Sequence, residues 1–121
     1  MNTYIVMQII LTDEQIDQVN AAYVNAAQQA MPDFYNRYMK ATMFPKQEAV
    51  QAAYEAFDYE TVAAVDANDL EEVFAIGNGM GDNTKLTKLA KMKSVSVGDI
   101  IVEEKTGKMF YVDTFGFQEV Y

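Results

Sequence analysis

The sequence predicts a single-domain α+β fold for this chain of 121 residues. The expected architecture is an N-terminal strand, three to four short helices and a C-terminal antiparallel β meander. Three observations predict it: the chain starts with β-branched and aromatic residues, its middle places apolar residues at helical spacing, and its end alternates short apolar runs with glycine turns. Half of the residues are hydrophobic, which suffices for one buried core.

The first expected element is a buried strand over residues 3–11, where β-branched and aromatic side chains predominate. A helix is expected directly after it. Thr12 can cap this helix, and Gln15, three residues later, can reach back to the Thr12 amide in a capping box. Apolar residues at helical spacing continue to Ala30, and the small side chains near that end favour a close helix neighbour.

Two more helices are expected in the middle of the chain. One begins at Asp33, after a break at Pro32, and presents aromatic and methionine side chains until Phe44-Pro45 stops it. The other carries an apolar stripe from Ala49 to Phe57 at the spacing of a helix that faces the core. We therefore expect Phe57 to be buried.

A short apolar strand is expected over residues 61–65, followed by a brief helix over 69–76. Asp66 or Asn68 can cap this helix, its acidic first turn suits the positive end of the helix dipole, and Gly77 is placed to end it. The glycine-rich segment that follows lacks the context and the spacing of a nucleotide-binding loop. We interpret it as a helix end that runs into a connection.

The segment from Lys85 to Lys93 contains four lysines, three of which would lie near one face if the segment were helical. Beyond it, β structure over 94–97 is expected to lead through a turn at Gly98-Asp99 into strands over 100–103, 108–113 and 117–121. Charge divides the chain at the same place: residues 1–84 hold 13 acidic and three basic residues, and residues 85–121 hold five and six. An acidic, mainly helical part and a lysine-edged β part are expected within the one domain.

Composition excludes several kinds of chemistry. Cysteine and histidine are both absent, so the chain cannot form disulfides, thiolate or histidine zinc sites, or a catalytic site with a histidine base. We expect no enzyme activity, no cofactor and no metal. The net charge of −9 opposes binding of the whole chain to nucleic acid or to an anionic membrane, and the apolar start is too short to span a bilayer. A cytoplasmic protein is expected.

Two groups of residues are candidates for a protein interface. Acidic side chains of the expected helix over 69–76 could engage a basic partner, and aromatic side chains of the meander could anchor one. The candidates are Asp69, Glu71, Glu72, Tyr111, Phe115 and Phe117. An unpaired edge of a small sheet would also favour a homodimer.

Two alternatives stay open beside a protein interface. A small nucleic-acid-binding module would contact a phosphate backbone through Lys85, Lys88, Lys91 and Lys93. A metal-dependent hydrolase, ranked last, would use the carboxylates of Asp66, Asp69, Glu71 and Glu72. The order of these acids does not match a calcium-binding loop, because Leu70 stands where an oxygen ligand is needed.

The C-terminal residues resemble a known family. Residues 94–101 read SVSVGDII and residues 111–117 read YVDTFGF, and both are similar to the SxSVGDxI and YVDxFGF segments of YodL-like domains, which occur in phages and mobile elements. The resemblance implies a phage or mobile-element origin. It implies no established activity, so no catalytic residues are carried over.

With this resemblance, we expect a non-enzymatic accessory protein that binds a host or phage protein, in counter-defence or host modulation, within the host cytoplasm. The two segments themselves are interpreted as structural. Gly98-Asp99 suits a tight turn into a strand, and Gly116 allows a sharp reversal between two phenylalanines.

Overall fold

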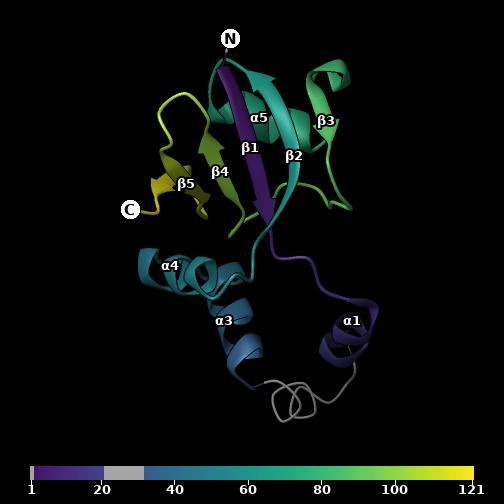
Figure 1. Ribbon diagram of the computed structural model, residues 1–121, viewed down its shortest axis with the longest axis vertical. Coiled ribbons are helices and arrows are strands. Elements are labelled where there is room, and N and C mark those ends of the chain that lie inside the picture. Colours follow the sequence, from purple (N-terminus) through teal and green to yellow (C-terminus); the bar gives the residue numbers. More distant parts are fainter. Residues whose placement is uncertain (1, 21–31) are drawn as a thin grey trace.

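The computed structural model describes residues 2–20 and 32–121. Its centre is a six-stranded sheet in which neighbouring strands are antiparallel. The order β3-β2-β1-β4-β5-β6 places β1 between β2 and β4 (Figure 1). The strands are β1 (Asn2–Gln8), β2 (Glu60–Ala67), β3 (Leu86–Lys88), β4 (Ile100–Glu103), β5 (Met109–Val112) and β6 (Phe117–Glu119). Together with the helices, this sheet confirms the predicted single-domain α+β fold.

The helices occupy two regions around the sheet. Within the described residues they are α1 (Asp13–Asn20), α3 (Pro32–Thr42), α4 (Gln47–Glu55) and α5 (Leu70–Gly77). The last of these, α5, lies behind the sheet in Figure 1, whereas α3 and α4 lie together beyond one end of it. None of these helices is long and apolar enough to cross a membrane.

Hydrophobic clusters lie on both faces of the sheet, because successive side chains of a strand point to opposite sides. On the α5 side, Val6 and Ile101 belong to a cluster that includes Val73 of α5. On the other side, Ile100 joins a cluster that includes Val50 of α4. Adjacent residues of β4 thus connect the sheet to both groups of helices.

The first two predicted elements are largely confirmed. β1 ends at Gln8, three residues before the expected end of the strand. The capping box is present: the Gln15 amide donates to Thr12 Oγ1 at 3.1 Å, and the Thr12 amide donates to Gln15 Oε1 at 2.8 Å. The expected continuation of this helix to Ala30, with its small side chains, falls on residues 21–31 and lies outside the described residues.

The chain reverses directly after α4, and this reversal contradicts the expected burial of Phe57. The Asp58 amide donates to the Ala53 carbonyl at 3.0 Å, and the Phe57 amide donates to the Tyr54 carbonyl at 3.1 Å. Phe57 adopts a φ of 61°, and its side chain is 91% exposed. The helix ends before its apolar stripe reaches Phe57, so the reversal directs this ring to solvent.

Replacing Phe57 with glycine is therefore expected to raise the free energy of unfolding by about 1 kcal/mol, because glycine adopts positive φ without a Cβ penalty. Urea denaturation followed by circular dichroism measures the change. Phe57→Ala is the matched control, since it removes the same exposed ring but keeps the penalty. An equal gain in both variants would contradict the backbone explanation.

The structure differs from the sequence expectations for residues 66–97 in three respects. The cap of α5 is Asp69 and not Asp66 or Asn68. Residues 85–93 do not form a helix: a short 3-10 helix over Asn83–Lys85 leads into β3, and the chain then continues without regular structure to residue 97. β3 was not predicted, and it forms by pairing with β2.

The acidic part of the chain, residues 1–84, and the lysine-edged part, residues 85–121, do not form separate structural units. β1 and β2 come from the acidic part, and β3 to β6 come from the lysine-edged part, yet all six form one sheet. β1 pairs with β2 on one side and with β4 on the other. The two parts therefore share their core.

Candidate functional site

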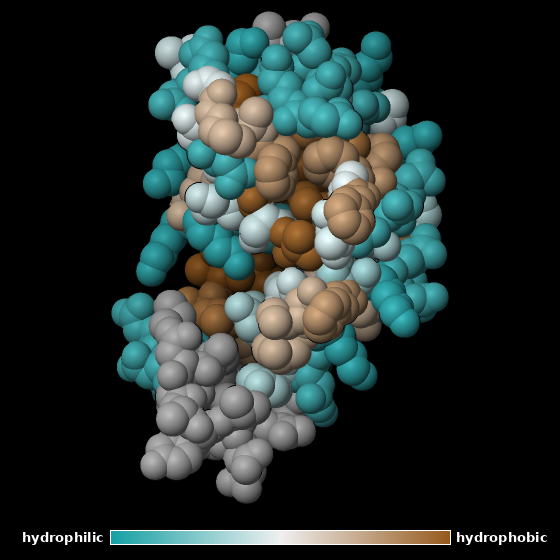
Figure 2. Space-filling model, turned by 180° about the vertical axis from the view of Figure 1, so that it is seen from behind, coloured by the Kyte–Doolittle hydropathy of each residue, from teal (hydrophilic) through white to brown (hydrophobic). Residues whose placement is uncertain are grey.

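A groove of about 310 Å³ lies where α5 meets the hairpin of β5 and β6. We term it the acidic–aromatic groove, and its lining residues are Glu71, Phe74, Val112, Asp113, Thr114, Gly116 and Phe117. The rings of Phe74 and Phe117 meet edge to face, with centroids 6.5 Å apart and an interplanar angle of 74°. On the face of the molecule that carries α5, Figure 2 shows hydrophobic side chains gathered between hydrophilic margins. The groove thus combines aromatic surface with carboxylates.

The hairpin turn at residues 113–116 borders this groove: Asp113, Thr114 and Gly116 line it, and Phe115 stands between them in the chain. The Asp113 amide donates to the Gly116 carbonyl at 2.9 Å, and Asp113 Oδ1 accepts from the Thr114 amide at 2.8 Å. Gly116 has a φ of 79°, a left-handed conformation that commonly completes such hairpin loops. The Phe115 side chain is 89% exposed. A hydrogen-bonded turn therefore holds a large apolar ring in solvent.

The acidic first turn of α5 serves mainly to begin the helix. Asp69 Oδ1 accepts from the Glu72 amide at 2.8 Å and so caps the helix, and Glu72 Oε1 accepts from the amide of Asn68, the residue before the cap, at 3.0 Å. Glu72 also lies 3.7 Å from the ammonium nitrogen of Lys85. Only Glu71 of the three acidic candidates lines the groove.

The aromatic candidates occupy three different environments. Tyr111 is 5% exposed and packs in the cluster on the α4 side of the sheet, so its side chain offers almost no surface to a partner. Phe117 is half-buried against Phe74, and Phe115 is exposed. The structure therefore brings Glu71 and Phe117 together and leaves Phe115 beside them.

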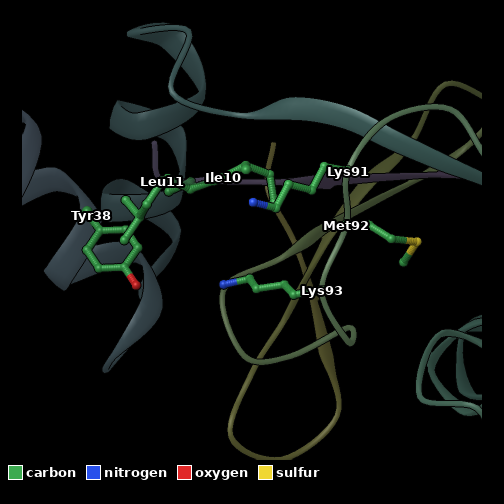
Figure 3. A pocket seen from close by; sticks show the side chains of 7 residues that line it. Ile10, Leu11, Tyr38, Lys91, Met92 and Lys93 are labelled. Atoms are coloured by element: carbon green, nitrogen blue, oxygen red, sulfur yellow. The ribbon is translucent and has the colours of Figure 1, made fainter. Parts of the chain in front are cut away.

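The four candidate lysines do not form one site. Lys85 approaches Glu72, and Lys88 lies on β3. Lys91 and Lys93 line a separate cavity, together with Ile10, Leu11 and Tyr38 (Figure 3). The segment is not helical, so the condition under which three of these lysines would share one face is not met.

The four carboxylates of the hydrolase hypothesis do not gather either. Asp66 Oδ1 accepts from Thr3 Oγ1 at 2.9 Å, and Asp69 and Glu72 are engaged in capping α5. Over residues 2–20 and 32–121 there is no group of three or more acidic side chains that could hold a metal ion.

Gly98, in the first of the two motif segments, is enclosed by backbone from several elements. Its amide donates to the Val112 carbonyl at 2.8 Å, and its carbonyl accepts from Tyr59 Oη at 2.5 Å. Its φ is 90°, and a Cβ at this position would lie 2.3 Å from the Ala41 carbonyl oxygen at the end of α3. No other residue fits here without displacing the backbone, so the turn requires glycine.

Asp99 follows Gly98 and is 2% exposed. Its Oδ2 accepts hydrogen bonds from the Ser96 amide and from Gln8 Nε2, each at 2.9 Å. Burial raises the pKa of Asp99 to about 6, although these two hydrogen bonds and the charge of Lys93 partly oppose the rise. The carboxyl group joins the turn to β1, as expected of a structural residue.

Two important residues were missed at the sequence level. Phe74 forms one wall of the groove, but only the topology reveals that it faces the hairpin. Gln8 is completely buried and binds Lys93, Ser94 and Asp99. A polar residue within an otherwise apolar run was the available signal for Gln8, because buried amides need partners.

Comparisons with known proteins identify a family and nothing more specific. Residues 25–121 match the family model of the YodL-like domain. No curated protein and no solved structure matches the chain. The matched range includes the acidic–aromatic groove and the Gly98-Asp99 turn, and it extends far beyond the C-terminal segments that first suggested the resemblance. The chain therefore belongs to the YodL-like domain family.

Proposed function

We propose that this chain is a non-enzymatic accessory protein of a phage or mobile element and that it binds a host or phage protein through the acidic–aromatic groove. The observation that carries this proposal is the display of Phe115 on a hydrogen-bonded turn beside the groove. Aromatic anchors contribute much of the binding energy of protein interfaces. Because the backbone of the turn is already ordered by hydrogen bonds, less of the chain must be ordered when a partner covers this ring.

The groove favours a partner with basic and apolar side chains. Glu71 and Asp113 supply negative charge, and Phe74 and Phe117 supply ring surface. A lysine or arginine can interact with both, through ion pairing and through cation–π contact. The net charge of −9 would add long-range attraction toward such a surface. Counter-defence or host modulation in the host cytoplasm is the setting that we propose for this binding.

The other hypotheses gain no specific support. The nucleic-acid hypothesis loses its common lysine face, and the hydrolase hypothesis loses a common carboxylate cluster within the described residues. A homodimer stays a prediction. The sheet edges β3 and β6 have three residues each, which leaves little backbone for pairing with a second copy.

Replacing Phe115 with alanine is expected to weaken binding to the natural partner by about 30-fold, the effect of losing a hot-spot residue. The tagged chain would be incubated with host lysate or phage-infected lysate, and stoichiometric partners would be identified by mass spectrometry. The affinity of the purified partner for each variant would then be measured by calorimetry.

Phe57→Ala is the matched control, because Phe57 is similarly exposed but lies in the turn after α4, which contributes no residue to the groove. It should bind the partner with unchanged affinity. Glu71→Lys should weaken binding, more strongly at low salt than at high salt. Absence of any stoichiometric partner, or an affinity that Phe115→Ala leaves unchanged, would overturn the proposal.

A further inference from the structure

A second cavity, of about 210 Å³, lies between the end of β1, α3 and the irregular segment before the Gly98-Asp99 turn. We term it the lysine pocket, and its lining residues are Ile9, Ile10, Leu11, Tyr38, Lys91, Met92 and Lys93. In Figure 3 the amino groups of Lys91 and Lys93 and the hydroxyl group of Tyr38 surround the same open space. It shares no lining residue with the acidic–aromatic groove.

The backbone that carries the lysines is held by a buried side chain. Gln8 is completely buried; its Nε2 donates to the Lys93 carbonyl at 2.9 Å, and its Oε1 accepts from the Lys93 amide at 3.1 Å. The same Nε2 lies 2.9 Å from Asp99 Oδ2, which anchors the amide group in turn. Residues 9–11, directly after Gln8, form the apolar wall. One strand end thus positions both the wall and the cationic rim.

The charge of this pocket contrasts with that of the chain. The net charge is −9, yet both charged side chains of the pocket are lysines. Neither Lys91 nor Lys93 forms an ion pair with any acidic group of the described residues. Two ammonium groups around one apolar cavity repel each other, and an anion between them would remove this repulsion.

We propose that the lysine pocket binds a small organic carboxylate with an apolar body. Its carboxylate contacts Lys91 and Lys93, and its apolar body lies against Leu11 and the ring of Tyr38, which face the same open space in Figure 3. A dry cavity of roughly 150 Å³ holds a benzene ring, so this cavity has room for a ring with a short side arm. Few polar groups around an apolar pocket are typical of small-molecule sites.

The test uses 3-phenylpropionate as the probe and 3-phenylpropanol as its neutral analogue. Both would be titrated into the full-length, nitrogen-15-labelled chain, and amide shifts would be followed by NMR. We expect saturable shifts at residues 9–11 and 91–93 with the carboxylate. The affinity for the alcohol should be weaker by about tenfold or more, because its neutral hydroxyl group forms no ion pair with the two ammonium groups.

The double variant Lys91→Gln/Lys93→Gln should weaken binding of the carboxylate by about tenfold or more and leave binding of the alcohol unchanged. Lys88→Gln/Lys105→Gln is the matched control, with the same net charge and with two exposed lysines outside the pocket. All four lysines are exposed, so both variants are expected to fold. Equal affinities for acid and alcohol, unchanged binding in the first variant, or absence of saturable shifts would each overturn the proposal.

Discussion

Replacing Gly98 with alanine is expected to lower the free energy of unfolding by about 2–5 kcal/mol, which combines a backbone penalty with a steric one. Gly98 has a φ of 90°, which L-residues rarely adopt. A Cβ would also lie 2.3 Å from the Ala41 carbonyl oxygen and 2.9 Å from the Thr42 Cα. These atoms belong to backbone, which cannot move aside as a flexible side chain would. Urea denaturation of both proteins measures the difference.

Gly107→Ala is the control that separates the two penalties. Gly107 has a φ of 74°, but a Cβ there would have nothing within 4 Å. This variant should lose only the backbone part, about 1–2 kcal/mol. If both variants lost the same stability, the close approach of the Gly98-Asp99 turn to the end of α3 would not contribute.

The second large effect is a dependence of stability on pH through Asp99. Burial raises the pKa of this carboxyl group from 3.8 to about 6 in the folded chain. Between these two values the folded chain binds more protons than the unfolded chain, so the free energy of unfolding falls as the pH rises. The complete change for this group is about 3 kcal/mol, and the loss is fully present above the folded pKa.

Asp99→Asn is expected to remove this contribution. The amide keeps an oxygen that can accept from the Ser96 amide and from Gln8, but it does not ionise. Relative to the original protein, the variant should gain about 2 kcal/mol of stability between pH 4.5 and pH 7.5. Asp17→Asn, at an exposed position of α1, is the control and should keep the original profile. A constant difference between Asp99→Asn and the original protein across this range would contradict the prediction.

Local signals in the sequence predicted those elements that depend on local interactions. The capping box of Thr12 and Gln15 spans three residues, and both hydrogen bonds are present. The strands β4, β5 and β6 follow each other as antiparallel neighbours, so alternation and turn residues were sufficient to predict them. In each case the determining contacts lie close together in the chain.

Elements that depend on distant contacts were not predicted. β3 contains a leucine, a threonine and a lysine, and it is a strand because its backbone pairs with residues 63–65 of β2. Tyr111 and Val112 are neighbours on β5 and point to opposite faces of the sheet, yet both are buried because both faces are covered. The sequence does not reveal how many faces of a strand are covered, because that depends on the position of helices elsewhere in the chain.

The candidate site was predicted in part for the same reason. Glu71, Phe115 and Phe117 were identified from their chemistry; Glu71 and Phe117 line the groove, and Phe115 is exposed in the turn that borders it. Phe74 completes the groove only because α5 packs across the sheet toward the β5–β6 hairpin. Lys91 and Lys93 were identified as a basic segment, but the apolar wall beside them comes from residues 9–11. The sequence indicated which kinds of side chain could form each site, but it did not indicate which residues from distant parts of the chain lie beside them.

The central position of β1 has a consequence for the boundaries of the folding unit. The family match begins at residue 25, whereas β1 ends at Gln8. A fragment cut to the matched range would retain β2 with β3 and β4 with β5 and β6, but it would lack the strand that joins these two halves. It would expose the edges of β2 and β4 and the hydrogen-bond partners of Gln8, and unpaired strand edges favour aggregation. The intact sheet therefore requires β1 in addition to the residues that the family model matches. A version of the protein made for expression or fusion should include both.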